Sequence, residues 1–321
     1  MTVENQYGHN PNPKVVVTSI SFGKSTVLRE ELLRAFPNAI FNENGQRLSG
    51  KKLIEFIGDA DAAIVGVETI NDSILKYTPE LKIISKYGVG LDSIDQESLK
   101  NRNISLGWKG GINRRSVSEL TLCFMLGLCR NVFDSGFKLK KSEWDKNGGY
   151  QLSGKAVGII GCGHVGSDVV RLLSPLNCKV LVQDIIDKSD FCQKQGASET
   201  SLGEVIERSD IISLHVPLTE LTRHIVNENF LKRMKSTAFL INTCRGEVID
   251  QEALKNALHQ RLVAGAALDV FLEEPPTDEE FLSLPNLMVT PHIGGNAREA
   301  VEAMGRSAID HLTAFFKKNS A

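Results

Sequence analysis

The chain has 321 residues, which exceeds the size at which a single hydrophobic core usually stops growing, so two domains are expected. It is 41% hydrophobic and 24% charged, and its net charge of −2 at pH 7 gives no attraction toward nucleic acid or an anionic membrane surface. The polar first residues, 1–13, contain no hydrophobic signal segment, and the longest apolar run, 120–128, is too short to span a membrane. Nucleic acid and membrane partners are therefore not expected.

Six cysteines are spread along the chain without a CxxC pair and without the Cys/His spacing of a metal site. In a chain with no secretory signal, such cysteines are expected to be free thiols rather than disulfides or metal ligands. We therefore predict no bound metal and a cytoplasmic location. The cysteines are Cys123, Cys129, Cys162, Cys178, Cys192 and Cys244.

The first third of the chain alternates short apolar runs with helical patterns. VVVTSI, from Val15, predicts a strand; Ser25 to Phe36 predicts a helix; and runs at 62–66 and 81–86 predict further strands. Such alternation is typical of a parallel, doubly wound sheet. The GKST segment at 23–26 resembles the end of a phosphate-binding P-loop, but Thr18 occupies the position where that pattern requires glycine.

The segment KYGVGLDSID, from Lys86 to Asp95, forms a glycine-rich turn directly after a predicted strand. Ligands of open α/β sheets bind beyond the carboxyl ends of the strands, and exposed backbone N–H groups here could hold a carboxylate. The alternative is an ordinary strand-to-helix turn with Asp92 as the helix cap. The residues alone leave both interpretations open.

The middle of the chain predicts a strand at 104–106, a glycine-containing connector at 108–112 and a long helix at 116–129. The helix is apolar on nearly every side, which indicates that it is buried. The charged, glycine-punctuated segment 138–150 predicts a helix and a loop leading into the next unit.

Residues 154–184 carry the most specific local pattern in the chain. An apolar strand at 156–160 precedes Gly161, Gly163 and Gly166 in G-x-G-x-x-G spacing, and a helical pattern follows. The first glycine allows a tight turn, the second lets a pyrophosphate approach the backbone, and the third permits close packing of helix on strand. Free N–H groups at the helix start complete an anion site. This order predicts a dinucleotide-binding unit.

Asp184 ends the second strand of this unit, 179–182. A carboxylate here would accept hydrogen bonds from the adenosine ribose and would repel a 2′-phosphate. No arginine follows closely, since the next residues are Ile185, Ile186 and Asp187. We therefore predict NAD rather than NADP as the cofactor.

Four further predicted strands each end in polar or special residues, where a bound nicotinamide would point. They are 210–214, 237–241, 264–268 and 287–289. The final helix, 297–317, has one apolar stripe and is expected to return to the first domain, making that domain discontinuous. We predict one domain from 1–107 with 298–321, and a second from 108–297.

Arg245, Glu274 and His292 stand out at these strand ends. Redox exchange between a nicotinamide and a 2-hydroxy acid needs a proton donor and acceptor, which histidine supplies because its pKa lies near neutrality. A neighbouring glutamate would raise that pKa and orient the ring, and an arginine would pair with the substrate carboxylate. Each residue taken singly has a structural explanation, but their joint position after the nucleotide pattern favours catalysis.

At this point the whole chain resembles the D-isomer-specific 2-hydroxyacid dehydrogenases, and among them the phosphoglycerate dehydrogenase-like members. The motifs VGIIGCGHVG, SLHVPLTELTR, INTCRGEVID, AGAALDVFLEEPP and TPHIGG stand in family order and spacing. The resemblance implies an α/β fold with two doubly wound parallel-sheet domains, a Rossmann NAD-binding domain inserted in a flavodoxin-like substrate domain. It also implies that Arg245 binds substrate, that His292 is the acid/base, and that Glu274 rather than Glu273 pairs with it.

The same resemblance implies further contacts with cofactor and substrate. Asp184 would bind the ribose, Asp269 would lie near the carboxamide, and Val89 and Gly90 would offer N–H groups to the substrate carboxylate. The remaining implied cofactor contacts are Gly161, Gly163, His164, Val165 and Gly166 in the turn, His215 and Pro217 beside the adenine, Thr243 and Cys244 through their backbone, and Gly294 and Gly295 beside the nicotinamide.

Sequence differences from related dehydrogenases narrow the range of expected substrates. Formate dehydrogenases of this superfamily carry glutamine where Glu274 stands, and phosphite dehydrogenases carry lysine in place of Val89, so neither substrate is expected. The expected substrate is a 2-hydroxy or 2-keto acid. 3-Phosphoglycerate is one possibility, since cations at Lys86, Lys109 and 114–115 could hold a distal phosphate. Reduction of glyoxylate or hydroxypyruvate is the alternative.

A second alternative is an NAD(H)-sensing binding protein, like the transcriptional corepressors that share this scaffold. The absence of basic or peptide-recruiting tails argues against it. The resemblance further suggests a homodimer formed through the helices near 116–144. The chain ends at Ala321, so no C-terminal regulatory domain with serine feedback is expected.

Overall fold

The computed structural model describes residues 12–318, and the chain divides into two compact units. One unit ends at Asn113 and resumes at Arg298, and the other spans Arg114–Ala297. The first boundary therefore lies six residues later than the expected one at 107. The connector stays with the first unit because the Trp108 indole donates to the Val89 carbonyl and Ile112 packs against that unit's core.

The first unit is built on a five-stranded parallel sheet in the order β2-β1-β3-β4-β5, a flavodoxin-like order. Its strands are β1 (Val15–Val17), β2 (Ile40–Phe41), β3 (Ala62–Val65), β4 (Ile83–Lys86) and β5 (Ser105–Gly107). Its helices are α1 (Ile20–Lys24), α2 (Thr26–Ala35), α3 (Gly50–Ile57), α4 (Asp72–Leu75), α5 (Gln96–Asn101) and α14 (Arg298–Lys318).

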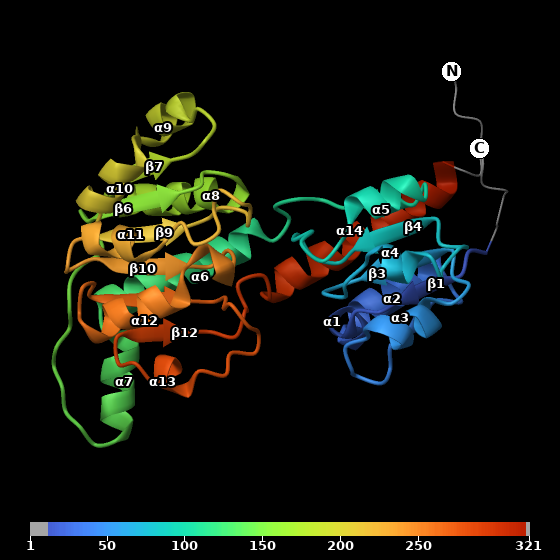
Figure 1. Cartoon of the computed structure of the whole chain (residues 1–321), viewed down its shortest axis with the longest axis horizontal. Coiled ribbons are helices and arrows are strands. Elements are labelled where there is room, and N and C mark those ends of the chain that lie inside the picture. Colours follow the sequence, from blue (N-terminus) through green and yellow to red (C-terminus); the bar gives the residue numbers. More distant parts are fainter. Residues whose placement is uncertain (1–11, 319–321) are drawn as a thin grey trace. The chain divides into compact units, whose positions relative to one another are not determined.

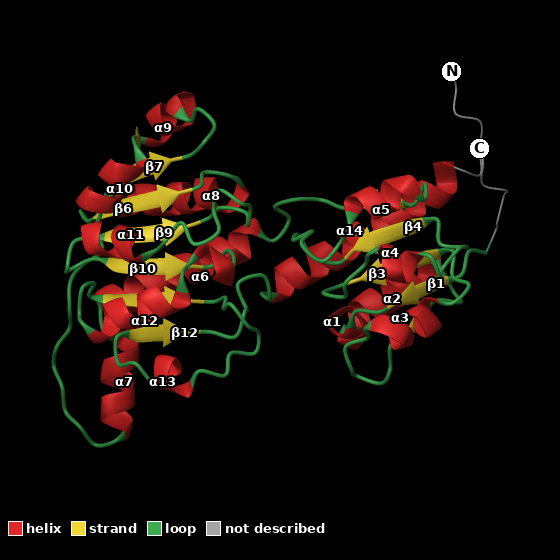
Figure 2. Cartoon of the chain, in the orientation of Figure 1, coloured by secondary structure: helices red, strands yellow, loops and turns green. Residues whose placement is uncertain are grey.

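Helices cover both faces of this sheet (Figures 1 and 2). Val15 and Val17 face a core shared with α1, α2 and α14, whereas Val16 faces a core shared with α3, α4 and α5. This alternation follows from the two-residue period of a strand, and it explains why the strands are apolar throughout. The chain's last helix thus packs on its first sheet, as its apolar stripe predicted.

The second unit contains a seven-stranded parallel sheet in the order β12-β11-β10-β9-β6-β7-β8. Its strands are β6 (Ala156–Ile160), β7 (Lys179–Gln183), β8 (Ser198–Glu199), β9 (Ile211–Leu214), β10 (Phe239–Asn242), β11 (Gly265–Leu268) and β12 (Leu287–Val289). The strand order reverses between β6 and β9, which is the arrangement of a dinucleotide-binding sheet.

Helices also cover both faces of the second sheet (Figure 2). The α-helices are α6 (Arg114–Cys129), α7 (Val132–Lys140), α8 (His164–Leu173), α9 (Ser189–Gln195), α10 (Leu202–Arg208), α11 (Glu228–Arg233), α12 (Gln251–His259) and α13 (Glu279–Leu282), and single 3-10 turns lie at η1 (Ser174–Leu176) and η2 (Gly246–Val248). One core involves α6, α8 and α9, and the other involves α10 to α13.

Two local features differ from the interpretations that the sequence offered. The helix after the glycine-rich turn of the first unit is capped by Asp95, whose carboxylate accepts from the Ser98 N–H at 3.0 Å, and not by Asp92. The segment 138–150 is mostly irregular, because the preceding helix α7 already ends at Lys140. Among residues 12–318 no single helix is long and apolar enough to cross a membrane, although α6 and α7, as a pair bent by 64°, meet the same criteria of length and composition.

Candidate active site

Polar residues of the second unit gather at the carboxyl ends of its strands, where the strand order reverses. His215 follows β9, Asn242 ends β10, Asp269 follows β11 and Thr290 follows β12. Because all these strands are parallel, their carboxyl ends lie along one edge of the sheet. The residues that sequence reasoning selected for chemistry in this unit belong to the loops at this edge.

The glycine turn between β6 and α8 has a different requirement at each glycine. Gly161 has φ +88°, and a Cβ there would lie 2.7 Å from the His215 carbonyl oxygen. At Gly166 a Cβ would lie 2.0 Å from the Gly161 oxygen, so only glycine lets α8 pack this closely. A Cβ at Gly163, by contrast, would meet no protein atom within 4 Å. The fold leaves that position open, which fits the approach of a dinucleotide pyrophosphate.

Asp184 is anchored to the same turn. Its carboxylate accepts from the Cys162 N–H at 2.6 Å and from the Ile186 N–H at 2.9 Å. These bonds hold a half-buried carboxylate at the end of β7, beside the turn. A carboxylate has acceptor capacity beyond these two bonds, so the ribose hydroxyls of NAD remain suitable partners.

The loop after β10 places Arg245, and a residue that sequence reasoning missed organises it. The fully buried side chain of Asn242 donates to the Arg245 carbonyl at 2.8 Å and accepts from the Cys244 N–H at 3.0 Å. The Arg245 Nη1 donates to the Cys244 carbonyl at 2.6 Å. The N–H and carbonyl of Cys244, expected to face the cofactor, thus both take part in bonds within the loop. An asparagine ending an apolar strand was the available signal for this role.

His292 and Glu274 form an ion pair, with 2.7 Å between Nδ1 and Oε2. The hydrogen bond to Glu274 raises the pKa of His292 above its ordinary value, against the opposing effect of burial. Burial alone would raise the pKa of Glu274, but the hydrogen bond and the charge of His292 outweigh it and lower that pKa. The Phe271 N–H, which donates to Oε1 at 3.2 Å, acts in the same direction.

Arg245 lies close enough to this pair for its positive charge to lower the pKa of both Glu274 and His292. The three side chains come from loops after β10, β11 and β12, which are neighbouring strands in the sheet. The fold therefore brings together a guanidinium, a carboxylate and an imidazole that are up to 47 residues apart in sequence.

The His292 loop is held in place by Asp269, which is 1% exposed. Its carboxylate accepts from the Thr290 hydroxyl at 2.6 Å and from the N–H groups of Ile293 and Gly294 at 2.7 Å each. His292 itself has φ +53°, a backbone conformation that a non-glycine residue adopts only where its surroundings enforce it. Asp269 thus fixes the backbone of the loop that carries His292, an arrangement that the sequence did not reveal.

Other expected contacts have defined surroundings. The His215 Nε2 lies 2.9 Å from the Ser213 hydroxyl, and burial lowers the pKa of this ring, so it is neutral at pH 7. Burial raises the pKa of the Cys244 thiol to about 11, which favours the protonated thiol at pH 7. Thr243 shares a hydrogen bond with the Thr121 hydroxyl of α6 at 3.1 Å. Pro217 is exposed and accepts from the Thr222 hydroxyl through its carbonyl.

The remaining positions lie at the start of α8, in the loop after β12 or in the first unit. The Ser118 hydroxyl donates to the Val165 carbonyl at 3.4 Å, and the Ser116 hydroxyl donates to the Gly294 carbonyl at 2.5 Å. Val89 and Gly90 belong to the first unit, in the turn after β4, where Gly88 has φ +129°. Across residues 12–318 no group of three or more histidine, cysteine or acidic side chains could hold a metal ion.

Fold and site together define a nicotinamide-dependent oxidoreductase. Comparison with known proteins agrees, since residues 122–294 match the NAD-binding domain of the D-isomer-specific 2-hydroxyacid dehydrogenases. The chain is 35% identical to a glyoxylate reductase of Pyrococcus furiosus over 94% of its length and 92% of that protein. It is also 35% identical to a D-3-phosphoglycerate dehydrogenase of Methanocaldococcus jannaschii, over 89% of the chain and 55% of that longer protein.

A solved structure with the same architecture is the D-lactate dehydrogenase of Aquifex aeolicus, complexed with NAD and lactic acid. The match has a TM-score of 0.84 and 27% identity, and it covers 95% of this chain and 97% of the other. The chain belongs to the D-isomer-specific 2-hydroxyacid dehydrogenase family. It is an NAD-dependent oxidoreductase of D-2-hydroxy acids and their keto forms, as the motifs predicted.

Proposed function

We propose that this enzyme reduces small 2-keto acids to D-2-hydroxy acids, with Arg245, Glu274 and His292 as its catalytic residues. The observation that supports this most strongly is the His292–Glu274 ion pair, because it favours the protonated imidazole that carbonyl reduction requires. When NADH is bound, it supplies a hydride to the C2 carbon of the substrate.

Residues of the chain would donate the proton and orient the substrate. His292 uses Nδ1 for Glu274, so its Nε2 is the atom that would donate a proton to the carbonyl oxygen. Glu274 sustains the imidazolium and fixes the ring, while Arg245 orients the substrate carboxylate and polarises the carbonyl. Backbone N–H groups at Val89 and Gly90 would add hydrogen bonds to that carboxylate.

The cofactor contacts proposed here follow the edge of the second sheet. The pyrophosphate would lie at the start of α8, near Gly163, His164 and Val165, and Asp184 would bind the ribose hydroxyls. His215 and Pro217 would line the adenine side. Thr243, Cys244, Asp269, Gly294 and Gly295 would lie near the nicotinamide, and the Asp269 bonds to the 293–294 backbone support the rigidity of that end.

Glyoxylate and hydroxypyruvate are the substrates we favour over phosphorylated acids. Two of the cations considered for a distal phosphate are already engaged. The buried Lys86 ammonium donates to the Gly66 carbonyl, and Arg115 pairs with Asp168 at 2.9 Å. The related glyoxylate reductase matches over nearly its whole length. The related D-3-phosphoglycerate dehydrogenase keeps phosphohydroxypyruvate as the second candidate.

The test is to follow NADH absorbance at 340 nm (a wavelength specific to the reduced nicotinamide) with glyoxylate, hydroxypyruvate, pyruvate and phosphohydroxypyruvate. We expect the highest kcat/KM for glyoxylate or hydroxypyruvate. A higher value for phosphohydroxypyruvate would overturn the substrate assignment and leave the catalytic residues untouched. No turnover of any 2-keto acid would instead favour an NAD(H)-sensing protein.

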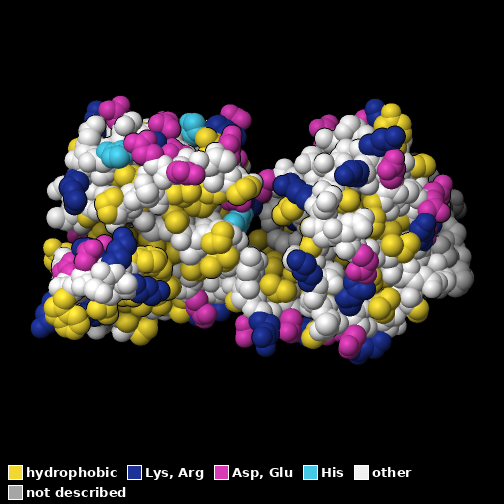
Figure 3. Space-filling view, turned by 90° about the horizontal axis from the view of Figure 1, so that it is seen from below, with side chains coloured by type: hydrophobic (Ala, Val, Ile, Leu, Met, Phe, Trp, Pro, Cys, Tyr) yellow, Lys and Arg dark blue, Asp and Glu magenta, His cyan; other side chains and the backbone are white. Residues whose placement is uncertain are grey.

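We also propose that the enzyme is a homodimer and acts in the cytoplasm. Apolar side chains are exposed on α7 and in the segment after it, with Phe137 61% and Trp144 77% accessible, and Figure 3, seen from below, shows large apolar areas on this unit. An apolar surface of this kind supports association with a second copy. All six cysteines are free thiols, which supports a reducing compartment.

A further inference from the structure

The turn after β4 is anchored on either side of residues 88–90 but hardly within them. Before this segment, the Tyr87 N–H donates to the last residue of β3 at 2.9 Å, and after it the Leu91 carbonyl accepts a backbone hydrogen bond at 2.9 Å. Among the described residues, a single hydrogen bond reaches the backbone of the segment itself. The Trp108 indole N–H donates it to the Val89 carbonyl at 2.9 Å.

The register of two strands places Trp108 beside this turn. β4 and β5 are parallel neighbours in which Gly107 lies opposite Ser85, so the next residue, Trp108, follows β5 at the edge where the turn begins. Its side chain is 41% exposed, whereas tryptophan is highly buried on average, so packing in a core does not account for an indole at this position. An indole N–H usually finds a hydrogen-bond acceptor, and here the acceptor belongs to the turn.

The bond to Val89 fixes the direction of a second polar group. The peptide bond between Val89 and Gly90 is trans and planar, so the Val89 carbonyl and the Gly90 N–H point in opposite directions. Glycine accepts a wide range of φ, so Gly90 itself does not prevent this peptide group from turning over. With the carbonyl held by the indole, the peptide group directs the Gly90 N–H to the side away from Trp108.

We propose that Trp108 is a positioning residue that aims the Gly90 N–H at the carboxylate of a 2-keto acid. This inference rests on the proposed function, in which Val89 and Gly90 donate to that carboxylate. The N–H groups of both half-buried residues have no acceptor among the described residues, so a ligand oxygen can satisfy them. The indole lies on the other side of the peptide group and contacts no reacting atom.

The consequence of losing the indole donor follows from the two orientations of this peptide group. In the alternative orientation the Val89 carbonyl, rather than the Gly90 N–H, faces the substrate carboxylate and repels it. One hydrogen bond biases such an equilibrium by roughly two- to tenfold. The apparent affinity for a ligand falls with the fraction of protein in the competent orientation, whereas a bound ligand restores that orientation. The loss therefore concerns substrate binding more than the chemical step.

Trp108→Phe tests this, because it removes the indole N–H and keeps an aromatic ring. For the 2-keto acid that the parent enzyme reduces best, we expect KM to rise by roughly two- to tenfold and kcat to stay within about twofold. Oxamate, an unreactive analogue with the same carboxylate, should bind the NADH-loaded variant more weakly by the same factor. Isothermal titration calorimetry measures its Kd directly, which matters because KM equals a dissociation constant only when chemistry is slow.

Tyr77→Phe is the matched control, since it removes one polar hydrogen from an exposed aromatic side chain of the same unit. It should change neither KM nor the oxamate Kd. In Trp108→Phe, NADH affinity and the free energy of unfolding should also match the parent, because the expected loss is confined to the carboxylate.

Three outcomes would overturn the proposal. An unchanged KM and oxamate Kd in Trp108→Phe, with an active parent, would remove Trp108 from substrate positioning and leave the proposed function intact. Parallel losses of kcat, NADH affinity and stability would show that Trp108 serves only the folded structure. A parent enzyme that reduces no 2-keto acid would overturn the proposed function together with this inference.

Discussion

At the scale of single residues, the proposed chemistry depends on the protonation state of one imidazole. His292 is held by Glu274 through Nδ1, and its backbone is held by the Asp269 loop. Replacing His292 by alanine removes the proton donor, and we expect kcat for keto-acid reduction to fall by about two to four orders of magnitude, with NADH affinity nearly unchanged. Stopped-flow turnover and NADH fluorescence titration measure the two quantities.

The matched control for this variant is His259→Ala, because His259 also pairs with a glutamate, Glu280, but lies on the surface at the end of α12. Turnover of the control should stay at the parent level. Equal losses in the two variants, or full activity of His292→Ala, would remove His292 from the mechanism.

We expect Glu274 to set the pH range of the reaction. Its hydrogen bond raises the pKa of His292, so the imidazole remains protonated to a higher pH, and reduction slows only as the pH rises through that raised pKa. In Glu274→Gln the hydrogen bond to a charged carboxylate is lost, so the pKa of His292 should fall and the alkaline limb of the kcat/KM profile should move to lower pH. The acid limb of the oxidative reaction should move in the same direction.

Glu273→Gln is the control variant, because it removes one negative charge at the exposed residue next to Glu274. Its pH profile should match that of the parent enzyme. A Glu274→Gln profile that coincides with the parent profile would show that the ion pair does not control protonation during turnover.

At the scale of elements, two glycines of the turn between β6 and α8 are expected to serve different purposes. Gly166 is needed for folding, and Gly163 is needed for cofactor binding. A Cβ at Gly166 would collide with the backbone oxygen of Gly161, which cannot yield as a side chain can. For Gly166→Ala we expect a loss of about 1–3 kcal/mol in the free energy of unfolding, more than the gain of up to about 1 kcal/mol in helix propensity. Urea denaturation monitored by circular dichroism measures this difference.

Gly163→Ala is the companion variant, because a Cβ there meets no protein atom. Its stability should fall less than that of Gly166→Ala, whereas its NADH affinity should fall clearly, since the methyl group would obstruct the pyrophosphate. The reverse pattern, with intact NADH binding in Gly163→Ala, would place the pyrophosphate elsewhere.

We expect Asp184, at the end of β7, to decide the choice between NAD and NADP. Removing its charge in Asp184→Ala should improve NADPH binding relative to NADH by roughly tenfold, because a like-charge contact with the 2′-phosphate disappears. Kd values for both dinucleotides provide the measurement. Asp187→Ala, in which a nearby exposed carboxylate is removed, should leave the ratio unchanged; a parent enzyme that prefers NADPH would contradict the assignment.

At the scale of the whole molecule, α7 and the segment after it expose aromatic surface that a second copy would cover. Phe137→Asp places a charge on this surface, and we expect the variant to elute as a monomer in size-exclusion chromatography with light scattering, while the parent elutes as a dimer. Tyr77→Asp, at an equally exposed aromatic of the first unit, should remain dimeric. A monomeric parent would refute the proposed assembly.

The sequence by itself determined the two parallel sheets and the dinucleotide turn, and it selected three candidate catalytic side chains. It could do so because buried strands are continuous apolar runs, glycine spacing is local, and reactive residue types are few. Arg245, Glu274 and His292 were found as residues that follow predicted strands, and the order of parallel strands then brings them to one edge of the sheet.

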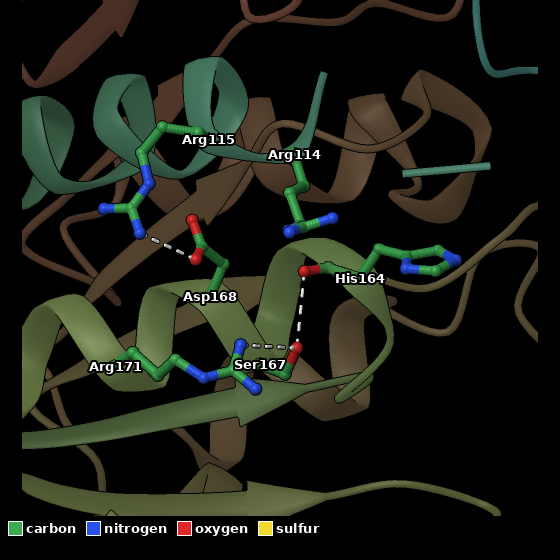
Figure 4. A pocket seen from close by; sticks show the side chains of 6 residues that line it. All are labelled: Arg114, Arg115, His164, Ser167, Asp168 and Arg171. Atoms are coloured by element: carbon green, nitrogen blue, oxygen red, sulfur yellow. Dashed lines mark hydrogen bonds and ion pairs between the residues drawn. The ribbon is translucent and has the colours of Figure 1, made fainter. Parts of the chain in front are cut away.

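Only the tertiary structure decided what holds those side chains in place. The Asn242 side chain forms hydrogen bonds within the Arg245 loop, and Asp269 accepts hydrogen bonds from the backbone of the His292 loop. Asp168 lies beside three arginines (Figure 4), with one oxygen paired and the other without a hydrogen-bond partner among the described residues. Their roles depend on hydrogen bonds between segments that are distant in the chain, and on burial that local patterns do not encode. A polar residue after a strand looks the same in sequence whether it contacts solvent, substrate or the backbone of a neighbouring loop.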